Sequence, residues 1–495
     1  MTENSGWDNV IQETVGLSGL NTIRYVLGFA TTIYFARVLG PKVYGIATFS
    51  LSIVAFLKIT GIWGIKETIV QYDDSELDKI DVIFTYRLIY AVGFVIAATL
   101  LGTVFIHVYS YKVGVFIAVL GLGVGILLLS HVFRAILQRK MRLGKIGQAQ
   151  LGGQLGASTV GVVMALLGFH IWSLLVYYVA RNVIKSLGFV WYTNDTPQLN
   201  FKYKKLRGLF AVGRRVFGVV SINNIMNRVD DIVVGGFVGN RALGMYNISW
   251  KFAKASNSTV MPALNRAILS KINDISGNKI ALKNACHFTY KSHALIFMPV
   301  FALLSVMAPE IISVVYGPKW SDAVSIMQAM MIFGFLYSLY SISEHVYYAL
   351  ERQDEMFRTM LVSGGIYILS VVILTYVAGV KGTIVGVVIS FLLLNHSLIK
   401  NLGKNETLGI SLKAIVVPAL LPTCAASVVT KAVVYSLSVH GDIIKLIAGV
   451  AAFGFTYLLI LYYYQHELVC ALYRISRGSF GSEDVDYKKL TSKFV

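Results

Sequence analysis

Apolar runs long enough to cross a lipid bilayer follow one another along almost the whole chain, separated by short polar gaps. About 20 apolar residues of α-helix span the hydrocarbon core of a membrane. Two of the runs, 359–380 and 446–465, contain no charged residue. Because every backbone polar group must be satisfied inside the lipid, runs of this length predict membrane-spanning α-helices. We therefore expect an all-α integral membrane protein.

The amount of apolar sequence sets the expected number of helices. Hydrophobic residues make up 56% of the 495 positions and charged residues 14%, whereas soluble chains carry about 25% charged residues. This composition excludes a soluble multidomain enzyme and a disordered chain, and it suffices for about fourteen transmembrane helices. The expected spans are 15–39, 43–66, 82–108, 112–137, 146–167, 170–192, 213–238, 242–265, 288–316, 322–350, 357–380, 382–400, 412–437 and 443–466.

Basic residues are distributed unequally between the two sets of alternating loops. One set holds about twenty of them, including Arg139, Lys140 and the segment 202–215, against about seven in the other set. Positive charge accumulates in cytoplasmic loops, so the richer set and both termini are expected on the cytoplasmic side of the cell membrane. The same bias accounts for the formal net charge of +19 without a nucleic-acid partner.

The first two spans resemble the seventh and eighth when the chain is shifted by 199 positions. Gly40 then meets Gly239 and Gly45 meets Gly244, so two glycines five residues apart occupy the same turn in both copies. Copies separated by an even number of helices have the same orientation, which predicts a pseudo-twofold axis along the membrane normal and a cavity between two bundles. Transporters are often built in this way.

The repeat predicts two pseudo-symmetric six-helix lobes that form a central cavity, followed by two C-terminal helices. The expected boundaries are 1–192 for the N-terminal lobe, 193–212 for a cytoplasmic amphipathic linker, 213–400 for the C-terminal lobe, 401–466 for the last two helices and 467–495 for a cytoplasmic tail.

Charged residues inside the spans are the candidate site, because a charge in the membrane usually faces a cavity. Arg24, Lys58 and Arg181 share one layer of the first lobe, roughly 12–17 Å from the cytoplasmic surface by helical rise. The second lobe carries cations near mid-depth as well, at Arg228, Lys251 and Lys254. An excess of cations in a low-dielectric cavity attracts an anion such as a phosphate or pyrophosphate group.

The same residues also have a local interpretation. Arg228 can neutralise Asp231 one turn away, and Lys58 can extend to the cytoplasmic interface. Asp230 and Asp231, with Glu344 beside His345, are the candidates for coupling to a proton or sodium ion. For Glu344 and His345, a satisfied interhelical pair is the favoured interpretation. Among the aromatic residues, Tyr25, Tyr246 and Tyr340 are candidates for stacking on sugar rings.

No metal or cofactor is expected. The histidines are scattered without ligand spacing, and the chain has no phosphate-binding glycine loop of the ATPase type, so ATP hydrolysis by this chain is not the energy source.

Three segments resemble the polysaccharide transporter branch of the multidrug/oligosaccharidyl-lipid/polysaccharide exporter superfamily. They are 35–50 in the first hairpin, 230–239 in the seventh span and 315–320 after the ninth. The resemblance implies a V of two lobes that moves a polyprenyl-(pyro)phosphate-linked oligosaccharide from the cytoplasmic to the outer leaflet. It implies basic cavity residues at Arg24, Lys58, and Lys251 or Lys254. The implied partners are the lipid-linked substrate, membrane lipids, a coupling ion and glycan-assembly enzymes.

Two other functions remain open from the sequence. A drug or small-solute antiporter of the same fold would mostly expel cations, which a cationic layer disfavours. A membrane glycosyltransferase or polymerase that uses polyprenyl donors would need acidic residues in an outer loop, where Glu310 and Asp322 stand alone. A scaffold for a synthase complex is the remaining alternative.

Overall fold

The computed structural model describes residues 2–61, 77–193, 197–201, 221–259, 279–406 and 412–464. These residues form α-helices and short 3₁₀ turns, with no β-strand among them. Eight of the described helices are long and apolar enough to cross a membrane, which confirms the expected all-α, multi-pass membrane fold. The predicted tail and most of the predicted linker lie outside the described residues.

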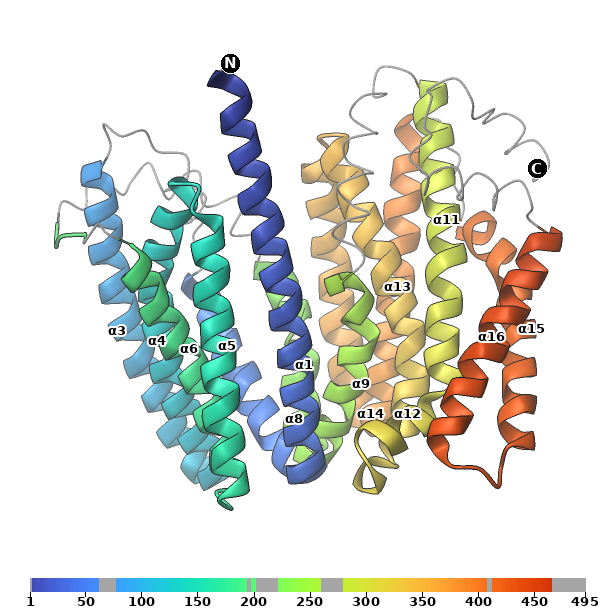
Figure 1. Cartoon of the computed structure of the whole chain (residues 1–495), viewed down its shortest axis with the longest axis horizontal. Helices are drawn as coiled ribbons and strands as arrows, with labels where there is room; N and C mark the ends of the chain where they lie inside the picture. The colour runs from blue at the N-terminus through green and yellow to red at the C-terminus, as the bar shows by residue number, and fades with distance from the viewer. Residues whose placement is uncertain are drawn as a thin grey trace. The chain divides into compact units, whose positions relative to one another are not determined.

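The helices run in the order labelled in Figure 1. They are α1 (Thr2–Leu57), η1 (Lys58–Gly61), α3 (Leu77–Val108), α4 (Tyr111–Arg139), α5 (Leu143–Leu166), α6 (Ile171–Tyr192), α8 (Val229–Phe237), α9 (Asn240–Thr259), α11 (Lys279–Val306), α12 (Ala308–Val315), η4 (Pro318–Trp320), α13 (Ala323–Ala349), α14 (Gln353–Glu406), α15 (Leu412–Ser436) and α16 (Asp442–Tyr464).

A backbone break divides α1 where the first two spans were expected to meet. Gly40 has φ 75°, a left-handed value that glycine adopts without strain, and Pro41 follows it. The second expected span was predicted as one helix over 43–66, but the α-helix ends at Leu57, and residues 62–66 lie outside the described residues. Lys58 therefore lies in the 3₁₀ turn η1 and not inside an α-helix. Gly61 follows within one turn, as is common where helices end.

The long helix α14 is a hairpin of two antiparallel segments. Its backbone breaks at Ala378 and Gly379, between the predicted spans 357–380 and 382–400. The Thr375 and Thr383 hydroxyls lie 2.7 Å apart across the turn. A Cβ on Gly382 would lie 1.8 Å from the carbonyl oxygen of Leu374, so only glycine allows this close approach.

The predicted span 288–316 is interrupted in the structure. The helix α11 ends at Val306 and α12 begins at Ala308. Pro309 stands in the first turn of α12, where its missing N–H and fixed φ are tolerated but would disrupt a continuous helix. The prediction of one helix here is wrong because this proline was not taken into account.

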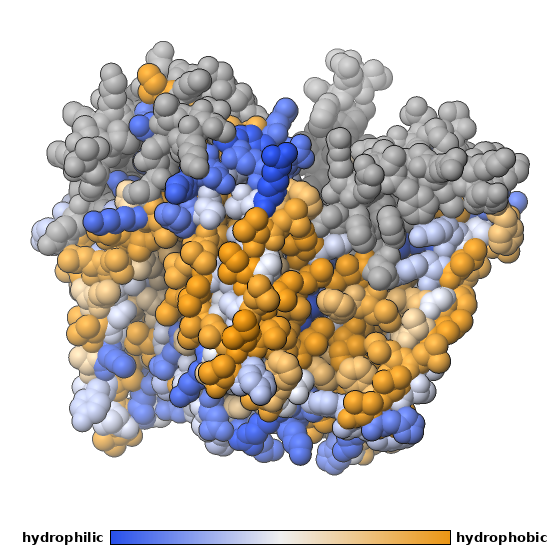
Figure 2. All heavy atoms as spheres, turned by 180° about the vertical axis from the view of Figure 1, so that it is seen from behind, coloured by the Kyte–Doolittle hydropathy of each residue, from blue (hydrophilic) through white to orange (hydrophobic). Residues whose placement is uncertain are grey.

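The chain divides into two compact units, which we call unit 1 (Met1–Asn247) and unit 2 (Ile248–Val495). In unit 1, α3 packs on α4, α5 packs on α6, and α1 and α4 join these pairs. Figure 2 shows apolar side chains over the middle of the visible face and hydrophilic ones toward its ends. This pattern is the one that a bilayer requires of lipid-facing helices.

Within unit 1, the two turns predicted to be equivalent contact each other reciprocally. A Cβ on Gly45 would lie 1.7 Å from the carbonyl oxygen of Asn240, and a Cβ on Gly244 would lie 2.1 Å from that of Pro41. Asn240 is the position equivalent to Pro41 under the shift of 199, and Gly244 is equivalent to Gly45. The glycine of each turn therefore contacts the same position of the other turn. Such an exchange is what a local twofold relationship produces, and it supports the internal repeat.

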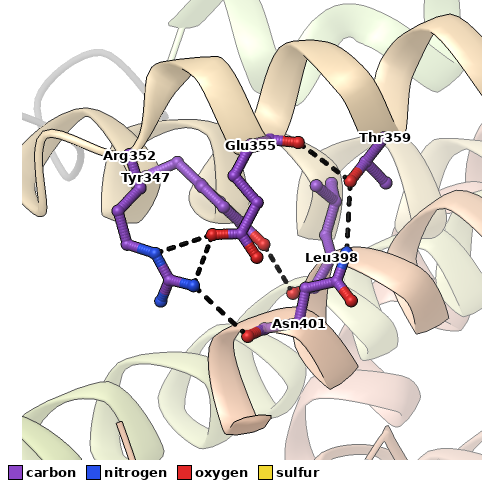
Figure 3. Close-up of polar contacts among 6 residues, drawn as sticks. All are labelled: Tyr347, Arg352, Glu355, Thr359, Leu398 and Asn401. Carbon is purple, nitrogen blue, oxygen red and sulfur yellow. Dashed lines mark hydrogen bonds and ion pairs between the residues drawn. The ribbon is translucent and has the colours of Figure 1, made fainter. Parts of the chain in front are cut away.

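In unit 2, polar contacts join α13 and the turn after it to both segments of α14 (Figure 3). Arg352 pairs with Glu355 and donates from Nη2 to the carbonyl oxygen of Asn401 at 3.5 Å. The Tyr347 hydroxyl donates to the carbonyl oxygen of Leu398 at 3.0 Å. These contacts tie the end of α13 and the turn after it to the second segment of α14.

Candidate functional site

Unit 1 gathers basic side chains from five elements into one region. We call six of them the cation cluster: Arg24, Lys58, Arg87, Arg134, Arg181 and Lys185. Lys185 is close enough to interact electrostatically with Arg181, Lys58, Arg24 and Arg134, and Lys58 interacts with Arg87 and Arg134. The structure therefore brings together the three sequence-predicted cations of the first lobe.

The cation cluster lies in one half of the helices that carry it. Tyr192 and Thr193, at the end of α6, contact Lys145 and the carbonyl of Phe133, so the end of α6 lies beside the α4–α5 turn. At about 1.5 Å per residue, Arg134 lies roughly 8 Å from the end of α4. By the same measure, Lys185 and Arg181 lie roughly 10 and 16 Å from the end of α6. This half carries the basic α4–α5 turn.

Arg24 is held by a neutral partner on another helix. Its Nη1 donates to Oε1 of Gln150 on α5 at 2.9 Å, and its guanidinium lies 4.7 Å from the ring centroid of Tyr25. Gln150 is 8% exposed, so burial restricts its conformations. The contact orients the guanidinium without cancelling its charge.

Arg181 and Lys185 also have neutral partners. The Arg181 guanidinium lies 5.6 Å and 5.3 Å from the ring centroids of Tyr177 and Tyr178, within the range of cation–π attraction. The Lys185 ammonium lies 3.5 Å from the side-chain oxygen of Asn182. The position of Tyr177 is fixed in turn by a hydrogen bond of 3.1 Å from Gln154.

The charge of the cation cluster is incompletely compensated within the described part of the chain. Among those residues no carboxylate forms an ion pair with Arg24, Lys58, Arg134, Arg181 or Lys185. The Nε of Arg134 makes no hydrogen bond among the described residues. Gathering these five half-buried cations without an acidic partner in the described part of the chain is unfavourable unless an anion joins them, so this arrangement suits an anionic group.

Sequence reasoning missed three members of the cation cluster: Arg87, Arg134 and Lys185. The available signal was a basic residue within each of the predicted spans 82–108, 112–137 and 170–192. Each lies in the half of its helix toward the end that is expected to be cytoplasmic, where a long basic side chain usually extends to the interface. Only the packing of α3, α4 and α6 shows that they converge.

The predicted acidic pair lies in α8 and joins three helices of unit 1. The Ser52 hydroxyl donates to Asp231 at 2.7 Å, and the Tyr246 hydroxyl donates to Asp230 at 2.7 Å. Arg228 lies 3.6 Å from Asp231, which is the local pairing that the sequence allowed. Arg228 also interacts electrostatically with Lys58, so it stands between the acidic pair and the cation cluster.

The remaining predicted site residues belong to unit 2. Lys251 and Lys254 are half-buried on α9, and Glu344 is half-buried on α13. Lys254 lies between two aromatic rings, at 3.8 Å from Trp250 and 3.9 Å from Tyr337. Beside Glu344, Nδ1 of His345 lies 2.8 Å from the carbonyl oxygen of Ser341. Among the described residues, no group of three or more His, Cys, Asp or Glu side chains is arranged to hold a metal ion.

Comparison with known protein families gives one match over more than half of the chain. Residues 34–325 match a family model described as a polysaccharide biosynthesis protein. Among characterised proteins, the succinoglycan biosynthesis transport protein ExoT of Rhizobium meliloti is 24% identical over 65% of this chain, and the alignment spans 64% of its own length. The lipopolysaccharide biosynthesis protein WzxC of Escherichia coli is 23% identical, over 73% of this chain and 74% of its own.

Solved structures share the fold at low sequence identity. A structure described as lipid II flippase MurJ in an inward closed conformation superposes with a TM-score of 0.74 at 15% identity, covering 92% of this chain and 99% of its own. An inward-facing multidrug resistance transporter of the MATE family gives a TM-score of 0.60 at 15% identity, covering 74% of this chain and 91% of its own.

Proposed function

This chain belongs to the polysaccharide biosynthesis protein family, and on this premise we propose that it is a flippase for a lipid-linked oligosaccharide. The substrate is an oligosaccharide joined through phosphate or pyrophosphate to a polyprenyl lipid. The protein moves it from the cytoplasmic to the outer leaflet by alternating access. Relatives named for transport in succinoglycan synthesis and for lipopolysaccharide synthesis support this proposal.

The single observation that carries the proposal is the cation cluster of unit 1. A phosphate or pyrophosphate group has several negative charges and accepts hydrogen bonds at every free oxygen. Guanidinium groups match that geometry with two parallel donors, and lysines add point charge. Arg24 and Arg181 are already oriented by neutral contacts, so little ordering is needed when the anion binds.

The lysines of unit 2, together with Arg228, remain further proposed contacts for the substrate. Asp230, Asp231 and Glu344 are the proposed coupling groups, because an intramembrane carboxylate is the usual place for a proton or sodium ion to bind. The protein has a transport role and not a catalytic one. Both termini lie in the cytoplasm in this proposal, and enzymes of glycan assembly are proposed to contact the protein there.

The cation cluster favours this function over an antiporter of the same fold. A binding site for cationic drugs needs net negative charge, whereas this region of unit 1 is positive.

Depletion of the protein in its own cells tests the function directly. We expect a lipid-linked glycan to accumulate on the cytoplasmic leaflet, where a membrane-impermeant glycosidase added outside cannot reach it. Identifying the accumulated lipid by mass spectrometry also identifies the glycan and its carrier. Unchanged levels of every lipid-linked glycan after depletion would contradict the proposal.

A further inference from the structure

A lysine and two aromatic rings form a compact cluster in unit 2. The Lys254 ammonium lies 3.8 Å from the ring centroid of Trp250 and 3.9 Å from that of Tyr337. A third ring, that of Phe333, lies at 6.0 Å. Trp250, Lys254 and Tyr337 are all half-buried, so each retains some accessible surface. We call these three residues the aromatic–lysine cluster.

A tight helix crossing positions the cluster. A Cβ on Gly334 of α13 would lie 3.0 Å from the carbonyl oxygen of Ala253 on α9. Tyr337 stands one turn after Gly334, and Lys254 follows Ala253, so the crossing brings the ring and the ammonium together. Both lie roughly 21 Å along their helices at about 1.5 Å per residue, which is within the apolar core of a bilayer about 30 Å thick.

Buried aromatic residues hold the ring of Tyr337 in place. Its centroid lies 5.6 Å from that of Phe333, 5.8 Å from that of Phe391 and 6.1 Å from that of Tyr340. Phe333 and Phe391 themselves pack edge to face at 5.1 Å. A ring fixed in this way presents the same surface before and after a ligand binds, which reduces the ordering cost of binding.

The fold itself does not require this arrangement. Under the internal shift of 199 positions, Trp250 corresponds to Leu51 and Lys254 to Ala55. The first copy therefore has small or aliphatic residues at both positions, with neither an aromatic ring nor a charge. A lysine inside the membrane is unfavourable even when cation–π contacts offset part of its cost. Its presence in only one copy points to a function and not to packing.

The sequence pointed to other aromatic residues as sugar-stacking groups. Tyr246 is fully buried and Tyr340 is 5% exposed, so neither offers a ring face to a ligand. The half-buried rings of the aromatic–lysine cluster offer the ring surface that Tyr246 and Tyr340 do not. The third candidate, Tyr25, is 54% exposed and its ring lies against the Arg24 guanidinium.

We propose that the aromatic–lysine cluster is a contact site for a sugar ring of the transported glycan. A pyranose ring has a face of C–H groups, which packs on the accessible part of an aromatic ring, and an edge of hydroxyl groups. The Lys254 ammonium is a hydrogen-bond donor group, and it binds the hydroxyl edge. Apolar surface with a few fixed polar groups is the usual composition of small-ligand sites. This inference rests on the proposed function and names the part of the substrate that contacts unit 2.

Binding measurements on the intact protein in nanodiscs test the assignment. The probes are undecaprenyl pyrophosphate without sugar, and the same lipid carrying glucose, galactose or N-acetylglucosamine, with dissociation constants measured by native mass spectrometry. The variants are Trp250→Leu, which installs the residue of the first copy, and Lys254→Met, which keeps the chain length without the charge. Trp191→Leu is the matched control, because that tryptophan is 84% exposed on α6.

We expect at least one sugar-bearing lipid to bind more tightly than the bare lipid. Trp250→Leu should remove that difference, roughly three- to tenfold for loss of one aromatic contact, and leave binding of the bare lipid unchanged. Lys254→Met should act on the sugar-bearing lipid in the same way. Trp191→Leu should change neither.

Two results would overturn the sugar site while leaving the proposed function intact. One is equal binding of bare and sugar-bearing lipids by the unmodified protein. The other is an equal loss for both lipids in Lys254→Met, which would make Lys254 a phosphate contact. If no probe binds the unmodified protein, with or without sugar, the proposed function itself fails.

Discussion

The guanidinium of Arg24 on α1 donates a hydrogen bond of 2.9 Å to the side-chain oxygen of Gln150 on α5. The partner is neutral, so the contact fixes the direction of the arginine and leaves its positive charge available. A structural arginine in a membrane is more often paired with a carboxylate. This relationship makes Arg24 the residue on which the proposed anion site is most directly tested.

Replacing Arg24 with alanine should abolish glycan export while the protein still reaches the membrane at a normal level. Loss of a charged contact of this kind corresponds to about 1.5–3 kcal/mol, or roughly ten- to a hundredfold in affinity. Arg24→Lys should retain part of the activity, because the charge survives without the two-pronged donor. Export and membrane abundance should be measured on the same cells, with Lys42→Ala as the control on α1. Normal export per molecule in Arg24→Ala would refute the assignment.

Arg134 and Lys185 should contribute to the same anion site. Arg134→Gln and Lys185→Gln are each expected to weaken binding of undecaprenyl pyrophosphate by about tenfold at low salt, and by less as salt rises, since part of the effect is electrostatic. Arg142→Gln, an exposed residue in the turn between α4 and α5, removes the same charge outside the cluster and should have little effect. Equal losses in all three variants would mean that only the net charge of the protein matters.

The orientation can be tested with single cysteines in a cysteine-free background. Cysteines at Arg241 and Gly441, both exposed, should react with a membrane-impermeant maleimide added outside the cell. A cysteine at Arg142 should react only after permeabilisation, because the basic loops are expected in the cytoplasm. Labelling of Arg142→Cys in intact cells would reverse the proposed orientation.

The reciprocal contact between the two repeats predicts matched effects of two glycine substitutions. Gly45→Ala and Gly244→Ala each place a Cβ against a backbone carbonyl that cannot rotate away, and overpacking of this kind destabilises by about 1–3 kcal/mol. Thermal unfolding in detergent should show similar losses for both. Gly236→Ala is the control, because a Cβ there has no atom within 4 Å. Destabilisation by only one of the two substitutions would argue against a symmetric contact.

Arg352 should stabilise unit 2 without taking part in transport. Arg352→Ala removes the pair with Glu355 and the hydrogen bond to the Asn401 carbonyl (Figure 3). The expected loss of stability is about 1–3 kcal/mol, measured by thermal unfolding, with the exposed Arg358→Ala as control. Export per folded molecule should stay unchanged, and a fall in that quantity would assign Arg352 a direct role.

The class of fold and the positions of several turns follow from the sequence. Length and hydropathy specify helices because lipid offers the backbone no other partner, and that requirement is local to each run. The same holds for Gly40 and Gly239, whose positive φ values of 75° and 106° match the predicted equivalent turns. The end of α1 at Leu57 and the break before Pro309 were not predicted, because apolar runs continue through both.

Tertiary structure alone decided which charges meet. Arg87, Arg134 and Lys185 each look in the sequence like a basic residue near a helix end. Only the packing of the helices brings Arg134 and Lys185 close to Arg24, and Arg87 close to Lys58. Likewise, Lys254 was recognised from the sequence as an intramembrane cation, but its partner Tyr337 lies on another helix. Hydropathy specifies that a helix crosses the membrane. Side-chain packing determines how that helix is rotated about its axis and which helices lie beside it. A site built from several helices is therefore fixed only when those helices are assembled.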